Sequence, residues 1–173
     1  MNHLDNIIAF FKRLFKKEEG GIVPTPTPTP DPTDLGIYLT AAEVKAKLKD
    51  QLAAKFSRDA KIYLPDTIYY CPSVAYTKKV LAESTTDMRT YIAEVQDCDD
   101  FAIMVKSDFV TDAYRNGTRR APHCMGIVWG LLPGPHAINF VLNDDGIVRF
   151  VEPQNDLVFL PRETDKGIWL MLS

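Results

Sequence analysis

Cys98 is the residue whose surroundings in the sequence most clearly predict chemistry. It opens the segment Cys98-Asp99-Asp100-Phe101-Ala102, and apolar residues continue at helical spacing as far as Ala113. Asp97 is therefore expected to cap a helix that begins at Cys98. Thiols at helix N-termini ionise more readily than free thiols, and the thiolate is the nucleophilic form. The sequence thus predicts a nucleophilic cysteine.

A nucleophilic cysteine also needs a base and a group that orients the base. His136 begins the apolar run 136–142, and Glu152 ends the run 147–152. The stretch Asn143-Asp144-Asp145-Gly146 between them predicts the turn of a β-hairpin, which would bring both side chains to one end of a sheet. Other residues stay open for these roles: His123 as the base, and Asn155 or Asp156 as the acid.

The order of these residues resembles the papain-like and transglutaminase-like cysteine peptidase superfamily, most of all the C-terminal papain-like domain of certain mushroom agglutinins, which also occurs alone in bacterial and phage proteins. Three motifs carry the resemblance: Cys98-Asp99-Asp100-Phe101-Ala102, His136-Ala137 and Glu152-Pro153-Gln154-Asn155. They span about the last half of the chain. The resemblance implies a papain-like α+β fold, in which a central helix carrying the cysteine packs on an antiparallel sheet carrying the histidine and the acid.

The resemblance also implies a cysteine peptidase that cleaves an amide of a peptide or protein substrate through a thioester. Cys98 would be the nucleophile, His136 the general base and Glu152 the orienting acid. Papain-like enzymes use a glutamine several residues before the cysteine as the oxyanion donor; here the nearest is Gln96, and the Tyr91 hydroxyl is an alternative. Two further functions remain open. One is transglutaminase-like amide transfer, and the other is a catalytically silent binding or structural module tethered by its N-terminal helix, for example in a phage particle.

Oxygen-bearing side chains surround the first and third motifs. Such hard oxygen ligands suit Ca²⁺, and the agglutinin domains are calcium-dependent. The resemblance therefore makes four residues the expected Ca²⁺ ligands: Asp99, Asp100, Gln154 and Asn155. A cation here would also offset the carboxylates beside Cys98, which by themselves oppose ionisation of a thiol.

The sequence predicts three segments. Residues 1–22 form an amphipathic helix suited to a membrane surface or a protein partner. Residues 23–34 alternate proline and threonine and form an extended polyproline II spacer. Residues 35–173 form the folded domain, in which the capping box Thr40-Ala41-Ala42-Glu43 opens a helix that reaches about Phe56.

The bulk composition limits the partners and the cellular compartment that we expect for the protein. The 173 residues carry a formal charge of −3 without a basic stripe, which argues against a nucleic-acid partner. Three cysteines cannot all pair with one another. No signal peptide and no run of about 18 apolar residues stands out. We therefore expect a cytoplasmic protein with free thiols, and a phage-encoded or virion-associated origin stays open.

Overall fold

The computed structural model describes residues 36–115 and 120–173. Its helices are α2 (Ala41–Gln51), α3 (Val74–Glu83) and α4 (Cys98–Arg115), with a 3₁₀ turn η1 (Ala53–Lys55). Its strands are β1 (Ile37–Thr40), β2 (Phe56–Tyr63), β3 (Ile68–Cys71), β4 (Met125–Leu131), β5 (Pro135–Leu142), β6 (Val148–Glu152), β7 (Leu157–Phe159) and β8 (Lys166–Leu172). Strands β1 and β3 form a small sheet, and the other strands form a six-stranded sheet in the order β2-β8-β4-β5-β6-β7.

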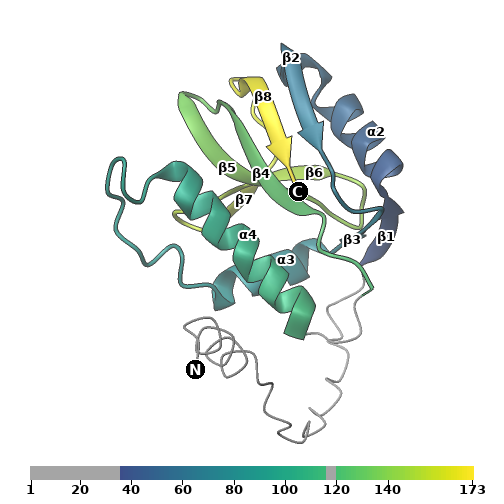
Figure 1. Ribbon diagram of the computed structural model, residues 1–173, viewed down its shortest axis with the longest axis horizontal. Coiled ribbons are helices and arrows are strands. Elements are labelled where there is room, and N and C mark those ends of the chain that lie inside the picture. The colour runs from purple at the N-terminus through teal and green to yellow at the C-terminus, as the bar shows by residue number, and fades with distance from the viewer. Residues whose placement is uncertain (1–35, 116–119) are drawn as a thin grey trace, which may run out of the picture.

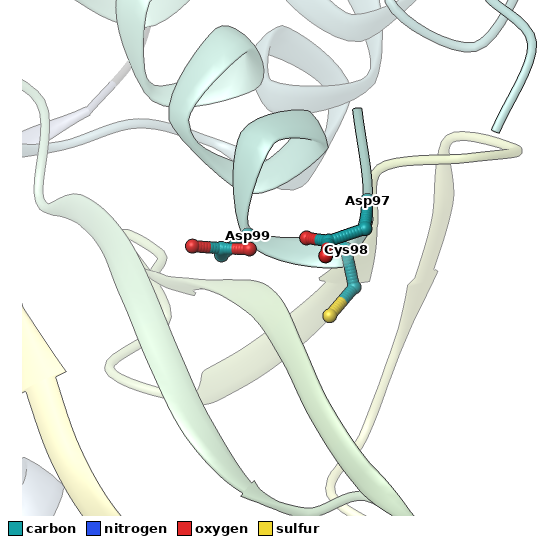
Figure 2. A group of neighbouring side chains, drawn as sticks. All are labelled: Asp97, Cys98 and Asp99. Atoms are coloured by element: carbon teal, nitrogen blue, oxygen red, sulfur yellow. The ribbon is translucent and has the colours of Figure 1, made fainter. Parts of the chain in front are cut away.

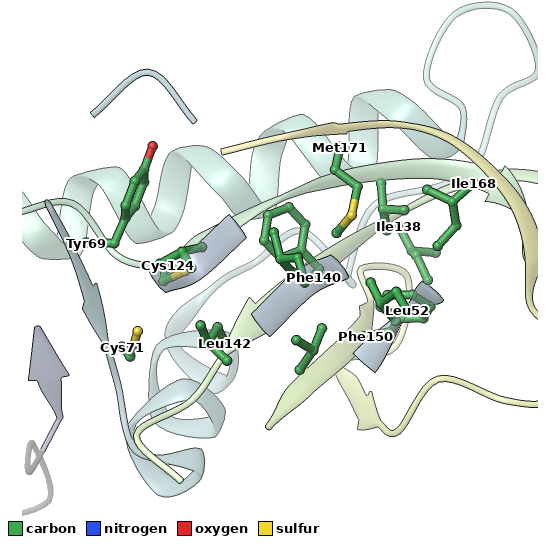
Figure 3. Close-up of a cluster of buried hydrophobic side chains, with 14 of the residues drawn as sticks. Leu52, Tyr69, Cys71, Cys124, Ile138, Phe140, Leu142, Phe150, Ile168 and Met171 are labelled. Atoms are coloured by element: carbon green, nitrogen blue, oxygen red, sulfur yellow. The ribbon is translucent and has the colours of Figure 1, made fainter. Parts of the chain in front are cut away.

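Helices pack against both faces of the large sheet (Figure 1). On one face, Val44 and Leu48 of α2 pack with Phe140 and Phe150 of the central strands, in the core drawn in Figure 3. On the other face, α3 and α4 pack with alternate residues of the same strands, such as Val141. This alternation follows from the pleat of a strand, which sends successive side chains to opposite faces. The sheet is therefore buried on both sides at its centre.

Helix α4 begins at Cys98, as the sequence predicts. The N–H of Asp97 donates to the carboxylate of Asp100 at 3.2 Å, and the Asp97 carbonyl accepts the N–H of Phe101. These bonds satisfy backbone groups at the helix start. The buried face of α4 repeats at helical spacing through Phe101, Ala102, Val105 and Phe109. The first turn, which carries the thiol, is thereby fixed against the sheet.

Helix α2 confirms the predicted capping box but is shorter than predicted. The Thr40 side chain accepts the N–H of Glu43, and the Glu43 carboxylate accepts the N–H of Thr40. The helix ends at Gln51, and β2 begins at Phe56, where the sequence analysis still expected helix. The chain leaves the helix at Leu52, a buried residue that belongs to the same core as Val44.

The large sheet is mixed, which corrects the expectation of an antiparallel sheet. Strands β2 and β8 are parallel, whereas the other pairs in this sheet are antiparallel. A parallel pair needs a long crossover, and its partner cannot be recognised from the local pattern of either strand. The predicted helix 1–22 and spacer 23–34 lie outside the described residues. Within the described part, no helix has the length and apolar character needed to cross a membrane.

Candidate functional site

Cys98 presents the accessible thiol among the three cysteines. Cys71 and Cys124 are buried, whereas Cys98 is partly exposed at the first position of α4. Its side chain packs against a small apolar cluster that includes Ala102, on the same helix, and Ala137, on β5. The Cys98 side chain therefore lies where the start of α4 packs against β5.

His136 and Glu152 form the pair that the hairpin pattern predicts. His136 Nε2 lies 3.0 Å from Glu152 Oε2, and the two side chains are 21% and 20% exposed. Strands β5 and β6 are antiparallel, and Gly146 in the turn between them has a φ of 75°, a conformation that glycine adopts readily. The second oxygen of Glu152 accepts the N–H of Gln154 at 3.4 Å. Glu152 can thus hold the imidazole ring in a fixed orientation.

The thiol and the imidazole lie on two elements, α4 and β5, that pack in one cluster, and no hydrogen bond joins the two side chains among the described residues. Ala137, which packs in the cluster with Cys98, directly follows His136 in β5. The start of α4, which carries the thiol, therefore packs on the strand that carries His136, but the base has no hydrogen bond to the thiol.

His123, the alternative base, has a structural environment. Its side chain is 1% exposed, and Nε2 lies 2.6 Å from Asp112 Oδ2. The ring packs edge-on against Phe109 and Tyr70 and stacks with Tyr76. Such burial separates His123 from solvent and from any ligand of the exposed thiol.

The expected oxyanion donor Gln96 points elsewhere. Its side-chain amide lies 4.0 Å from the sulfur of Met104, further along α4. Tyr91, the alternative, is half-exposed. Desolvation raises the pKa of Tyr91, and negative charge at Asp97 and Cys98 raises it further, which places its hydroxyl in the electrostatic range of the site.

The structure brings together a different set of potential metal ligands from the predicted calcium site. Asp97, Cys98 and Asp99 each offer one ligand atom, and these atoms lie within 4.8 Å of one another (Figure 2). The hydrogen bond with the Asp97 carboxyl is the largest cause that raises the pKa of Asp99, followed by desolvation. The Asp97 Oδ1 atom is buried and has no hydrogen-bond partner within the residues described. A cation would suit this crowded pair.

The other three predicted ligands make different contacts. The Asp100 carboxylate accepts the Asp97 N–H, and Asn155 Oδ1 accepts the N–H of Leu157 in a local turn. Gln154 donates its backbone N–H to Glu152. Of the predicted set, the structure brings only Asp99 into the cluster, and it adds Asp97, which the sequence analysis had assigned as a helix cap.

Comparison with known proteins defines the class of protein. The family described as "Ricin-type beta-trefoil lectin C-terminal domain" matches residues 38–171, so the chain belongs to this family. No curated protein matches the sequence.

Two solved structures share the fold. One is described as "PSL1a-E64 complex"; it has a TM-score of 0.70 and 26% identity, and the match covers 79% of this chain and 50% of that one. The other is Polyporus squamosus lectin bound to the human-type influenza-binding epitope Neu5Aca2-6Galb1-4GlcNAc, with a TM-score of 0.67, 26% identity and coverage of 79% and 49%. The chain spans about half the length of each.

These comparisons overturn the papain-like interpretation. The matched family and structures are lectins, so the assignments of a papain-like fold, of a cysteine peptidase and of an amide-transfer enzyme are wrong. A peptide or protein substrate loses its support with them. Three side chains in the order cysteine, histidine, acid do not by themselves define a fold or an activity. The fold is instead that of the lectin domain, which over the described residues consists of two β-sheets and three α-helices.

Proposed function

We propose that this chain is a non-enzymatic ligand-binding module of a lectin-type protein. Its membership of the lectin C-terminal domain family supports this function, which was one of the alternatives open from the sequence. The two similar structures hold E64 and a glycan epitope. Because this chain spans only half of those proteins, the position and chemistry of its own ligand are part of the proposal.

We place one ligand site at Cys98 and the His136–Glu152 pair. The observation that carries this proposal is the 3.0 Å contact between His136 and Glu152, both one-fifth exposed, with His136 on a strand whose Ala137 packs in one cluster with the partly exposed thiol. The pair offers a polar anchor, the thiol offers a soft nucleophile, and Ala137 and Trp129 offer an apolar floor. Binding sites commonly combine an apolar lining with a few polar groups in this way.

The test is labelling with E64, a thiol-reactive epoxide, followed by intact mass measurement and peptide mapping. We expect a single adduct at Cys98, because Cys71 and Cys124 are buried. Hydrogen bonding to Cys71, together with burial, also raises the pKa of Cys124, which leaves little of its reactive thiolate. Glu152→Gln should slow labelling several-fold, and Cys98→Ser should abolish it. Absence of an adduct, or equal labelling of all three thiols, would refute the site.

We also propose that Ca²⁺ binds at the start of α4. The unpartnered Asp97 oxygen and the repulsion within the Asp97–Asp99 pair support this. Asp99 and Asp97 would be the ligands that the present arrangement already offers. Asp100, Gln154 and Asn155 would join only if their current hydrogen bonds were exchanged. Bound Ca²⁺ would neutralise the carboxylates next to Cys98.

A further inference from the structure

A hollow beside helix α2 and strand β2 gathers positive charge. Its volume is about 450 Å³, and four of the nine residues that line it are cationic. They are Lys45 and Lys49 from α2, and Arg58 and Lys61 from β2. No aspartate or glutamate lines the hollow, although β2 itself carries Asp59. Figure 1 shows α2 and β2 side by side at one edge of the molecule.

These four charges have no carboxylate partners in the part of the chain that the structure describes. The ion pairs found there involve other residues. The chain as a whole is negative, at −3, so the positive charge is concentrated here against the overall balance. Like charges that converge on one hollow raise the local potential and attract anions. Anion binding would relieve their mutual repulsion.

The position of β2 explains only part of this charge. Among the strands of residues 36–115 and 120–173, β2 is at the edge of the sheet and pairs with β8 alone. Charged side chains on an edge strand disfavour pairing with a strand of another molecule. This role would account for the presence of Arg58 and Lys61 on β2. It does not account for Lys45 and Lys49, which stand one turn apart on α2 and face the same hollow from the helix side.

We propose that this hollow binds a small polyanion of the kind that sulfated or carboxylated saccharides provide. The volume falls within the usual range of roughly 300–1,000 Å³ for ligand sites. Tyr63, which is 52% exposed, adds a flat aromatic surface on which a sugar ring can rest. A single exposed aromatic does not form the stacking series that a nucleic-acid strand requires. The hollow shares no residue with the Cys98 site, so each proposal can fail without the other.

The test compares sucrose octasulfate with unmodified sucrose by isothermal titration calorimetry on the full chain. We expect the octasulfate to bind and sucrose not to bind. Replacing both helix residues, as Lys45→Gln/Lys49→Gln, should weaken octasulfate binding by about 10-fold, from the loss of two partly exposed ion pairs. The matched control Lys47→Gln/Lys78→Gln removes the same charge outside the hollow and should change affinity by less than about twofold. Melting temperatures of both variants would confirm that they fold.

Three results would overturn the proposal. The first is equal binding of sucrose and its octasulfate, which would remove the role of charge. The second is an affinity that the Lys45→Gln/Lys49→Gln variant leaves unchanged. The third is tighter binding of a single-stranded DNA oligomer of equal charge, which would identify a nucleic-acid surface in place of a saccharide site. E64 labelling of Cys98 should be the same with and without octasulfate, because the sites are separate.

Discussion

Asp156 shows how one residue can be strained by both its backbone and its charge. Its φ of 56° lies in the left-handed region, which is uncommon for residues other than glycine, although asparagine and aspartate adopt it more often than most. Burial raises its pKa to about 6, and negative charge at Asp87 and Asp108 contributes to the same shift. One of its carboxylate oxygens is buried without a hydrogen-bond partner within the described residues. At neutral pH, Asp156 is therefore an unfavourably placed anion.

Replacing this residue, as Asp156→Asn, should stabilise the protein at pH 7.5. The raised pKa means that the folded state favours the protonated carboxyl, so this residue's contribution to stability is lost as the pH rises from about 4 to about 6. Asparagine stays neutral as the pH rises, and it tolerates a positive φ. After allowance for the partial exposure of the site, we expect a gain of about 1 kcal/mol in the free energy of unfolding at pH 7.5.

Urea unfolding at pH 4 and at pH 7.5 measures this effect. The gain should be much smaller at pH 4, where the wild-type carboxyl is protonated. Asp144→Asn, at a turn that does not involve these carboxylates, is the control and should behave like wild type. A gain at pH 4 equal to that at pH 7.5 would assign the effect to the backbone alone.

The carboxylates at the start of α4 should respond to Ca²⁺. The raised pKa of Asp99 means that ionisation of its carboxyl costs stability as the pH rises above the usual aspartate value. A bound cation would reverse this cost. At pH 7.5, Ca²⁺ should raise the melting temperature by a few degrees, roughly 1 kcal/mol of stabilisation.

Two single substitutions separate the ligands of this site. Asp99→Asn should raise the melting temperature without metal and remove most of the response to Ca²⁺. Asp100→Asn weakens the acceptor of the Asp97 N–H but should leave the Ca²⁺ response in place. A melting temperature that neither Ca²⁺ nor a chelator changes would leave the pair as a proton-sharing pair without a metal role.

Among the secondary-structure elements, helix α4 depends on one buried polar contact with the sheet. The Asn139 side-chain amide on β5 donates to the carbonyl of Ala102 on α4 at 2.8 Å and to that of Gly126 on β4 at 3.2 Å. Asn139 is fully buried. This side chain therefore holds α4, the helix that begins at Cys98, at a fixed distance from β4 and β5.

Asn139→Ala should destabilise the protein by about 2–3 kcal/mol, because it leaves two buried carbonyls short of a donor and opens a small cavity. It should also slow E64 labelling of Cys98 by loosening the helix start. Chemical denaturation and labelling rates measure the two effects. The exposed Asn155→Ala serves as control and should cost no more than about 0.5 kcal/mol. Loss of stability without any change in labelling would show that Asn139 does not position the thiol.

Local sequence patterns predicted where helices and strands begin better than they predicted which strands pair with one another. The capping box at Thr40 and the helical spacing after Cys98 correctly gave the starts of α2 and α4. Strand β1 was missed because its four residues, Ile37–Thr40, are mostly exposed and show no buried alternation. The parallel partner of β2 was also missed, since the choice between parallel and antiparallel pairing is made by distant parts of the chain.

The site was predictable to a similar extent. The hairpin pattern correctly brought His136 to Glu152, because turn chemistry and strand alternation are local. Two of the predicted metal ligands, Asp100 and Asn155, use their oxygens in a local cap and a local turn, a competition that short polar side chains often win. The basic hollow had no sequence signal, because α2 and β2 are each an ordinary mixture of charges.

At the scale of the whole molecule, the chain from Leu35 should fold by itself. The core elements begin at Ile37, and the family match begins at residue 38. A protein made of residues 35–173 should melt within about 2 °C of the full chain and should label with E64 at the same rate. A fall of more than about 5 °C would show that residues 1–34 contribute to the core.

The parallel pair β2–β8 has a consequence for the order in which the protein folds. Phe56 pairs with Ile168, over a hundred positions further along the chain, and β8 also lies between β2 and β4 in the sheet. During synthesis, β2 is complete long before β8, the strand with which it pairs, exists, while β4, β5 and β6 can already pair as neighbours in sequence. Contacts between such distant segments slow folding, because the entropy of closing the loop is lost before the contact forms. We expect the nascent chain to hold an exposed β2 until β8 emerges, a stage at which it is open to aggregation or chaperone capture.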